Sequence, residues 1–272
     1  MWTLRAVLLC CALNAATVGV GLAAIGASAR AQDGPKLDPG DWSVTVGAGA
    51  GARPEYEGGK SIDVSPIPLL DIRVRPNWTL LDTVYLSTND GLGAVFFNNR
   101  DFKLGASLGY DFGRDEDDSD RLSGLGEIDA AARLRVFVGT SVGPVDMQLS
   151  VQRTIGGVDG TTVSLTMSHT WALTSDLRLR LSAAGDWGDE NYMSGYFGVS
   201  SEQAARSGLP RYDISSGVKS VSLSTSALYS LSPNWLIAGS LGIKQLLGDA
   251  ADSPIVESEL QPFGVIDLLY RF

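Results

Sequence analysis

Thiols, histidines and long hydrophobic segments are scarce in this chain of 272 residues, and each scarcity limits what the protein can be. The two cysteines, Cys10 and Cys11, lie near the N-terminus, and His169 is the single histidine. No run of 18 apolar residues occurs after residue 31, so a membrane-spanning helix is excluded there. The chain must bury its apolar surface in another way, and membrane-spanning strands of about 9–11 residues offer one.

The N-terminus has the features of a secretory signal peptide. Arg5 precedes an apolar stretch from Ala6 to about Ile25, and Ala29-Arg30-Ala31 has the small-x-small pattern that signal peptidase reads. We therefore expect residues 1–31 to be cleaved off before Gln32. An uncleaved membrane anchor is the alternative, but small residues dilute the apolar run and the cleavage pattern follows it directly.

Loss of this segment changes the chemistry of the chain. Leu9 stands before Cys10, where a lipoprotein signal needs a small residue, so both cysteines are expected to leave with the signal. The mature chain then has no thiol, disulfide or thiolate metal site. Loss of Arg5 and Arg30 moves the formal net charge from −10 to −12. A nucleic-acid partner is not expected, because phosphate binding depends on clustered Lys and Arg.

Apolar residues recur at every second position along almost all of the remaining chain. In segment 176–186, for example, Leu179 and Leu181 alternate with Arg178 and Arg180. Side chains alternate faces along a strand, so each such segment has one apolar and one polar face. The same alternation occurs in segments 102–112, 144–152 and 220–231.

The C-terminus shows the same pattern and ends on an aromatic residue. Ile266, Leu268, Tyr270 and the terminal Phe272 occupy alternate positions, which is typical of the last strand of an outer-membrane barrel. The strands of a soluble β-sandwich would also show alternating apolar and polar residues. The signal peptide, the terminal aromatic and the serines and charges on the second face favour the barrel.

We predict an all-β fold, namely a transmembrane antiparallel up-and-down β-barrel that forms a single domain over residues 32–272. Connections after even-numbered strands are short, whereas long loops follow odd-numbered ones, which places both termini in the periplasm. The third connection, Asn89-Asp90, is the weakest point of this strand assignment, because it is short for an external loop. If strands were merged or split there, the barrel would have ten or fourteen strands. The twelve predicted strands lie near 42–52, 61–75, 78–88, 91–98, 102–112, 125–141, 144–156, 161–173, 176–188, 212–231, 234–248 and 258–272.

Several segments of the chain, taken in order, form a recognisable set. They are the strand Trp42–Ala52 followed by Pro54-Glu55-Tyr56-Glu57-Gly58, then Gly113-Arg114, Leu122–Asp129, Tyr196–Val199, Ser207–Tyr212 and Asp252-Ser253-Pro254-Ile255. The set resembles the MltA-interacting protein (MipA/OmpV) family over essentially the whole mature chain. The resemblance implies a Gram-negative outer-membrane barrel. It also implies a scaffold that links a lytic transglycosylase to a peptidoglycan synthase, although other members are described as adhesins or antigens.

His169 would have to serve in any Ser-His mechanism. Its side chain shares a face with Met167 and Trp171, whereas Ser164 and Ser168 have the opposite parity. We therefore expect a lipid-facing histidine beside an aromatic girdle near the periplasmic rim, and not a lipid-active enzyme.

The segment Arg114–Arg121 carries five acids within eight residues. Oxygen ligands at this density could bind Ca²⁺, but the spacing lacks the Gly and the Glu that an EF-hand loop needs. We expect a solvated external loop, because charge runs are usually exposed.

Charged residues on the polar faces of the strands are expected to point into the lumen. In a porin they would ring a conducting pore, whereas in a narrow barrel they would pair and fill it. We expect a mostly occluded lumen. The residues concerned are Arg133, Arg135, Arg178, Arg180, Arg271, Glu127, Asp129, Asp146, Asp186 and Asp267.

The longest connection, Asp189–Arg211, has two interpretations. Glu202–Arg206 should form one or two helical turns, which Gly208-Leu209-Pro210 would end. The loop either folds into the barrel mouth as a plug or forms a docking surface, since aromatic residues are enriched at interfaces. The aromatic residues in question are Tyr192, Tyr196 and Phe197.

We predict a non-enzymatic outer-membrane scaffold or interaction protein linked to peptidoglycan synthesis and turnover, with a small-solute channel or a surface adhesin as the alternatives. No catalytic, cofactor-binding or metal-binding residue is assigned, and no cofactor is expected. The expected partners are outer-membrane lipids and lipopolysaccharide. The family resemblance implies two further partners, a lytic transglycosylase and a peptidoglycan synthase.

Overall fold

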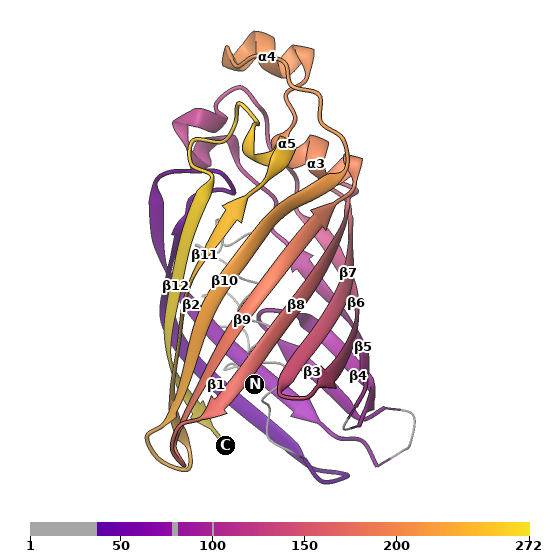
Figure 1. Cartoon of the computed structure of the whole chain (residues 1–272), viewed down its shortest axis with the longest axis vertical. Helices are drawn as coiled ribbons and strands as arrows, with labels where there is room; N and C mark the ends of the chain where they lie inside the picture. Colours follow the sequence, from indigo (N-terminus) through magenta and orange to yellow (C-terminus); the bar gives the residue numbers. More distant parts are fainter. Residues whose placement is uncertain (1–36, 78–80, 100) are drawn as a thin grey trace, which may run out of the picture.

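Twelve antiparallel strands form a closed barrel in which neighbours in sequence are neighbours in the sheet and β1 pairs with β12 (Figure 1). The computed structural model describes residues 37–77, 81–99 and 101–272, so the predicted signal peptide, residues 1–31, lies outside the described residues. The predicted fold class is confirmed. The strands are β1 (Trp42–Pro54), β2 (Ile62–Val74), β3 (Thr83–Ser87), β4 (Gly91–Asn98), β5 (Lys103–Asp111), β6 (Ala131–Val142), β7 (Val145–Ile155), β8 (Thr161–Ala172), β9 (Leu177–Gly188), β10 (Gly217–Ser230), β11 (Trp235–Leu246) and β12 (Leu260–Arg271).

The first and last strands close the barrel. Their register runs from Thr45 opposite Arg271 to Ala52 opposite Gly264. The terminal Phe272 donates its backbone N–H to the Val44 carbonyl at 2.9 Å. Its ring also lies 4.8 Å from that of Tyr270, edge to face. The C-terminal aromatic residue therefore belongs to the closing seam.

Three predicted strands begin later than expected. The third starts at Thr83 and not near residue 78, although residues 78–80 lie outside the described residues. The other two differences have a packing cause. The sixth strand starts at Ala131 and not near Leu125, because Leu125 is buried in a cluster of loop residues. The tenth starts at Gly217 and not near Tyr212, because Tyr212 forms an isolated β-bridge with Val199. The third connection, Thr88–Asp90, is indeed a short turn, and the β3–β4 hairpin below it is the shortest of the barrel.

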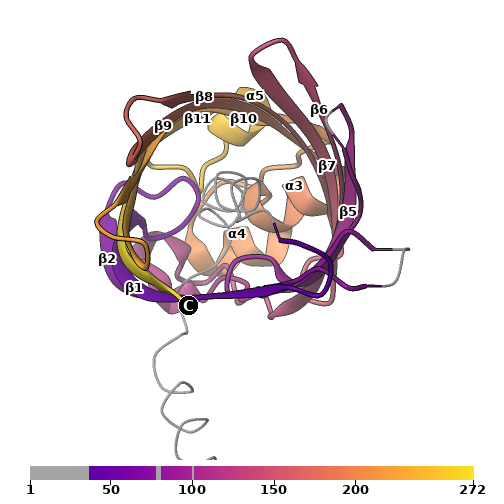
Figure 2. The same cartoon turned by 90° about the horizontal axis from the view of Figure 1, so that it is seen from below.

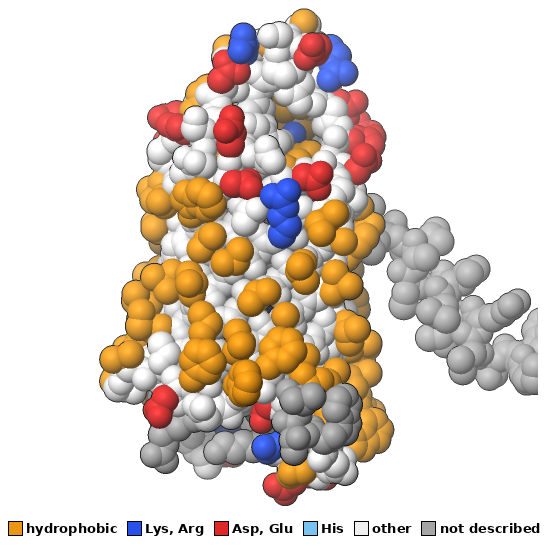
Figure 3. Space-filling view, turned by 90° about the vertical axis from the view of Figure 1, so that its right-hand side faces the viewer, with side chains coloured by type: hydrophobic (Ala, Val, Ile, Leu, Met, Phe, Trp, Pro, Cys, Tyr) orange, Lys and Arg blue, Asp and Glu red, His pale blue; other side chains and the backbone are white. Residues whose placement is uncertain are grey.

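The two faces of the wall differ in polarity as the alternation predicts. Leu181 of β9 is 41% exposed while Arg180 is 5% exposed, and on β10 Leu223 is exposed while Ser224 is buried. The outer surface carries a broad belt of hydrophobic side chains, with charged groups gathered at its two ends (Figure 3). This is the surface of a barrel that lies in lipid.

The two ends of the barrel are unlike. The helices α3 (Glu190–Phe197), α4 (Ser201–Ser207) and α5 (Gly248–Ala251) lie at one end, and the C-terminus lies at the other with the short turns (Figure 1). In bacterial outer-membrane barrels the short turns face the periplasm, so the helical end is the external one. Within the described residues no helix is long and apolar enough to cross a membrane.

The strand parity can be tested with a pair of arginine substitutions. Leu181→Arg should cost about 2–4 kcal/mol near the midplane because it puts a charge into lipid, whereas Ser182→Arg places the same charge in the lumen. Denaturant titration of the refolded barrel in phosphatidylcholine vesicles measures the unfolding free energy of both variants. Equal losses of unfolding free energy would show that the assigned faces are wrong.

Candidate functional site

The external loops fold together into a compact layer that we call the cap, formed by residues 55–61, 112–130, 189–216 and 247–259. Seen along the barrel, α3 and α4 lie within the ring of strands (Figure 2). Two buried clusters hold the cap together. One contains Tyr192, Met193, Tyr196, Phe197, Ile214, Leu246 and Ala250, and the other contains Tyr56, Leu122, Leu125, Val199 and Ile255.

The loop that carries α3 is a plug. Asp189 caps the helix, since its side chain accepts the Tyr192 N–H at 2.8 Å. Tyr192 and Tyr196 stack with ring centroids 4.6 Å apart, and both side chains are buried together with Phe197. These aromatic side chains fill the barrel mouth, so the alternative in which they form an exposed docking surface is wrong.

Segments that are distant in sequence meet in the cap, and they include the motifs that carry the family resemblance. Arg114 donates to the Tyr196 carbonyl at 3.1 Å, and Ser253 donates to the Phe197 carbonyl at 2.6 Å. Gly113 has φ +76°, and a Cβ there would lie 1.9 Å from the Ile128 carbonyl oxygen. Only glycine allows the backbone at position 113 to come this close to the Ile128 carbonyl, and this close packing positions the neighbouring Arg114.

A buried ion centre joins the cap to the wall. Glu57, from the β1–β2 loop, accepts hydrogen bonds from Lys219 Nζ at 2.7 and 3.0 Å and from Lys244 Nζ at 3.1 Å. The Tyr192 hydroxyl lies 3.4 Å from both the Glu57 carboxylate and Lys219 Nζ. The ammonium of Lys219 also sits 5.1 Å from the centre of the Tyr192 ring. The Glu57 carboxylate thus links two external segments, the β1–β2 loop and the loop that carries α3, to strands β10 and β11.

The electrostatics of this centre keep Glu57 ionised. Burial by itself would raise the pKa of its carboxyl, but the charges and hydrogen bonds of Lys219 and Lys244 outweigh burial and lower the pKa to about 2. Two ammonium groups around one carboxylate leave a local excess of one positive charge. Removal of the Glu57 carboxylate would leave two buried ammonium groups without a counterion.

None of the three residues of this centre was identified from the sequence. Glu57 lies in one of the segments that carry the family resemblance, but nothing in that segment indicates an ion pair. Lys244 shares its strand face with Ser240, so the alternation of faces indicates only that its side chain points into the lumen. Lys219 lies within an irregularity of the β9–β10 register, between Val218 and Ser220, where strict alternation of faces is lost.

The single histidine lies where it was expected. The rings of His169 and Trp171 meet edge to face with centroids 4.3 Å apart, and the His169 Nδ1 contacts the Pro144 carbonyl in a periplasmic turn. Ser168 is buried on the opposite face of the strand. The structure therefore places an interfacial histidine beside an aromatic residue.

The acidic segment folds into two short 3-10 helices, η1 (Glu116–Asp118) and η2 (Asp120–Leu122). Asp115 caps the first, since its carboxylate accepts the Asp117 N–H at 2.9 Å, and Asp118 accepts the Asp115 N–H at 3.1 Å. No group of three or more potential metal-ligating side chains is found among the described residues.

Most of the predicted lumen charges do point inward. Arg133, Arg180 and Asp267 are buried, and Arg135 pairs with Asp90 at 2.9 Å. Asp186 accepts a hydrogen bond from Ser220 at 3.0 Å. Glu127 and Asp129 are exceptions, because they precede β6 and are exposed in the external β5–β6 loop. Their placement on a lumen-facing strand was wrong.

The periplasmic half of the lumen holds a polar cavity of about 890 Å³. Its walls carry both signs of charge, and Arg75 pairs there with Asp82 at 3.5 Å. Leu37, the first described residue, lies in its lining, where the Leu37 carbonyl accepts a hydrogen bond from Arg75 at 2.9 Å. The cavity is thus lined by periplasmic strand ends, turns and the start of the described chain.

A family model described as "MltA-interacting protein MipA" matches residues 46–272. Among solved structures, the chain is similar to the COG4313 outer membrane channel from Pseudomonas putida F1, with a TM-score of 0.51 and 12% identity over 88% of this chain and 98% of that one. It is also similar to the translocator domain of the autotransporter NalP from Neisseria meningitidis, with a TM-score of 0.45 and 11% identity over 92% and 96% of the two chains. The first likeness supports the fold alone. No curated protein matches the chain.

The ion centre can be tested with Glu57→Gln. We expect the cap to lose roughly 3–5 kcal/mol, the cost of breaking a buried ion pair by removing one partner, and its loops to become protease-sensitive. Limited proteolysis of the folded barrel measures this. Glu190→Gln is the matched control, since Glu190 is exposed on α3. Identical cleavage rates for the two variants would contradict the assigned role.

The lowered pKa of Glu57 also predicts an acid transition. The pKa is about 2 in the folded protein and about 4.3 in an unfolded chain. The contribution of Glu57 to stability is therefore complete above about pH 4.3 and is lost as the pH falls towards 2. Near-UV circular dichroism of the buried tyrosines should report a transition in this window. Its persistence in Glu57→Gln would assign it to other groups.

Proposed function

Because the chain belongs to the MltA-interacting protein MipA family, we propose that this outer-membrane β-barrel is a non-enzymatic scaffold whose periplasmic end binds an enzyme of peptidoglycan turnover. The partner we propose is a lytic transglycosylase, and the support for it is the family description "MltA-interacting protein MipA". A peptidoglycan synthase is a second proposed partner, which rests on the family resemblance.

The observation that carries the proposal is the contrast between the two ends of the barrel. The external mouth is filled by buried side chains of the cap and bridged by Glu57. The periplasmic end has a polar cavity of about 890 Å³ and exposed turns. A partner in the periplasm can therefore reach a large surface of mixed charge, to which proposed cleavage before Gln32 would add the mature N-terminal stretch.

Two neighbouring turns offer a rigid part of this surface. The β8–β9 and β10–β11 turns are joined by the Ser230 N–H, which donates to the Asp176 carbonyl at 2.8 Å. Asn234 Nδ2 donates to the Arg271 carbonyl at 2.8 Å, which ties the second turn to the last strand. Leu173 and Leu231 are exposed beside these turns. Apolar side chains on an ordered polar surface are typical of interfaces.

Charging these two turns tests the proposal. We expect Ser175→Glu combined with Pro233→Glu to weaken capture of a transglycosylase from crosslinked envelopes several-fold, because each adds a carboxylate beside the exposed leucines. Neither side chain bonds to the neighbouring strands, so the barrel should still fold. The matched control is Ser201→Glu with Ala205→Glu on the external helix α4, where both residues are exposed. Equal capture by the two double variants would place the partner elsewhere or remove the scaffold role.

A small-solute channel is the second candidate, and the periplasmic cavity is the observation that favours it. Conductance in planar bilayers separates the two functions. A scaffold with a closed cap should be silent, and Glu57→Gln should begin to conduct as the cap loosens. A stable open pore in the wild-type barrel would favour the channel.

A further inference from the structure

The barrel wall is incomplete beside the external half of β2. Strand β2 pairs with β1 along its whole length, from Ile62 to Val74. On its other edge it pairs with β3 only from Asp71 to Val74, and beyond these residues Leu70 and Thr88 are joined by hydrogen bonds in both directions. Within the described chain, the edge from Ile62 to Leu69 has no strand partner. The short β3–β4 hairpin leaves this gap between β2 and β5.

The sequence of β2 is adapted to a free edge. The Leu70 N–H points towards the hairpin, because it donates to Thr88 Oγ1 at 3.2 Å. Alternate residues of a strand direct their backbone N–H groups to the same side, so Pro66 and Pro68 have their missing N–H groups on the gap side. Proline is tolerated on edge strands for this reason, and it blocks pairing with a further strand. A strand from a partner protein is therefore a poor occupant of the gap.

The opposite rim of the gap lies at the outer edge of the lipid belt. β5 pairs with β4 only up to Leu108, and beyond that point Tyr110 and Phe112 face outward, 54% and 42% exposed. Aromatic residues mark the membrane interface in such barrels. On the β2 rim Val64 is 68% exposed. The gap thus opens from the outer half of the lipid belt and has apolar side chains on both sides.

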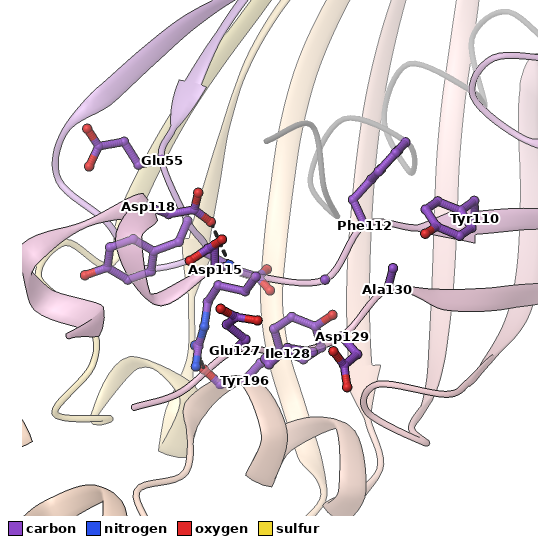
Figure 4. A pocket seen from close by; sticks show the side chains of 14 residues that line it. Glu55, Tyr110, Phe112, Asp115, Asp118, Glu127, Ile128, Asp129, Ala130 and Tyr196 are labelled. Carbon is purple, nitrogen blue, oxygen red and sulfur yellow. Dashed lines mark hydrogen bonds between the residues drawn. The ribbon is translucent and has the colours of Figure 1, made fainter. Parts of the chain in front are cut away.

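Behind the rim lies a pocket of about 280 Å³ between the β1–β2 loop and the β5–β6 loop. Figure 3, which views the side of the barrel that carries β5–β7, shows a hollow in the external half with a basic side chain inside it. In Figure 4, Tyr110 and Phe112 lie at one side of the pocket, Glu55 and Asp118 lie at the other, and Glu127 lies between them. The pocket therefore joins an aromatic rim to an acidic interior.

The interior of the pocket is strongly anionic. Six carboxylates and one guanidinium line it. Glu57 is neutralised by Lys219 and Lys244, but Glu55, Glu127 and Asp129 have no ion pair among the described residues. A ligand that brings a positive charge would satisfy these carboxylates.

We propose that this opening is a lateral binding site for a cationic amphiphile that enters from the outer leaflet. Its hydrocarbon part packs between the β2 edge and the aromatic rim of Tyr110 and Phe112, and its ammonium group reaches Glu127 and Asp129. Neither part alone accounts for the geometry, since the rim offers no charge and the carboxylates lie in the pocket behind it. The site is independent of the proposed scaffold role, which uses the opposite end of the barrel.

The test uses the mature barrel in phosphatidylcholine nanodiscs and a dodecyltrimethylammonium probe with a photoreactive diazirine in its chain. We expect crosslinks at β2 residues 62–69 and at Tyr110 and Phe112. Glu127→Gln combined with Asp129→Asn should weaken saturable labelling on the order of tenfold, because each partly exposed ion pair contributes a few-fold. Glu190→Gln combined with Glu202→Gln is the matched control and should label like the wild type.

Three results would overturn the site. The first is labelling spread evenly around the barrel or unchanged by the Glu127/Asp129 variant. The second is equal labelling by a dodecyl sulfate probe of the same chain length. The third is displacement of the probe by tetramethylammonium as efficiently as by unlabelled dodecyltrimethylammonium, which would show a polar cation site without the lateral part. Heat-modifiable mobility on gels verifies that each variant is folded, and Tyr110→Ala with Phe112→Ala should weaken only the long-chain probe.

Discussion

Backbone hydrogen bonding in a medium without water is the constraint on which this structure depends. Each unpaired N–H or C=O in hydrocarbon costs several kcal/mol, so a sheet that spans a membrane has to close on itself. Here β1 meets β12, with Thr45 opposite Arg271 at one end of the seam and Ala52 opposite Gly264 at the other. Closure fixes the alternation of faces, because a strand shifted by one residue would turn its leucines into the lumen and its charges into lipid. The antiparallel seam between β1 and β12 also requires an even number of strands, which brings both ends of the chain to the same side.

Closure of the wall creates a second problem, because a lumen lined with charges is open to water at both ends. The cap solves it at the external end, and it does so with buried apolar clusters and one ion centre. Glu57 lies 162 residues before Lys219 and 187 residues before Lys244 in sequence, so the closed wall is what brings these side chains together. Cap and wall are therefore expected to be coupled: what loosens the Glu57 centre also frees the loops that fill the mouth. This coupling explains how the external end can be packed like a soluble core while the periplasmic end keeps a large polar cavity.

Much of the fold followed from periodicity, while most of the site did not. Lipid on one side and lumen on the other impose a period of two, so strand number and the faces of residues such as Leu181 and Arg180 could be predicted. The pattern misled where apolar residues alternate inside a loop, as at Leu125 and Tyr212, because there burial comes from contacts within the cap. Glu127 and Asp129 were misplaced for the same reason. The Glu57 centre was missed, since a pairing across more than 160 residues leaves no local pattern.

The gap beside β2 shows how the closure constraint is relaxed at one place. Along most of the wall, a free edge would expose N–H groups to lipid and invite another strand. Pro66 and Pro68 remove two of those donors on the gap side, so the edge costs less to expose and cannot template a neighbour. The two prolines were visible in the sequence, but their meaning depends on which edge they face, and that follows from the Leu70–Thr88 contact. A β3–β4 hairpin extended to full length would have closed the wall with ordinary pairing. Because the wall instead combines a short hairpin, a proline-bearing edge and an acidic pocket behind it, we interpret the gap as a functional opening.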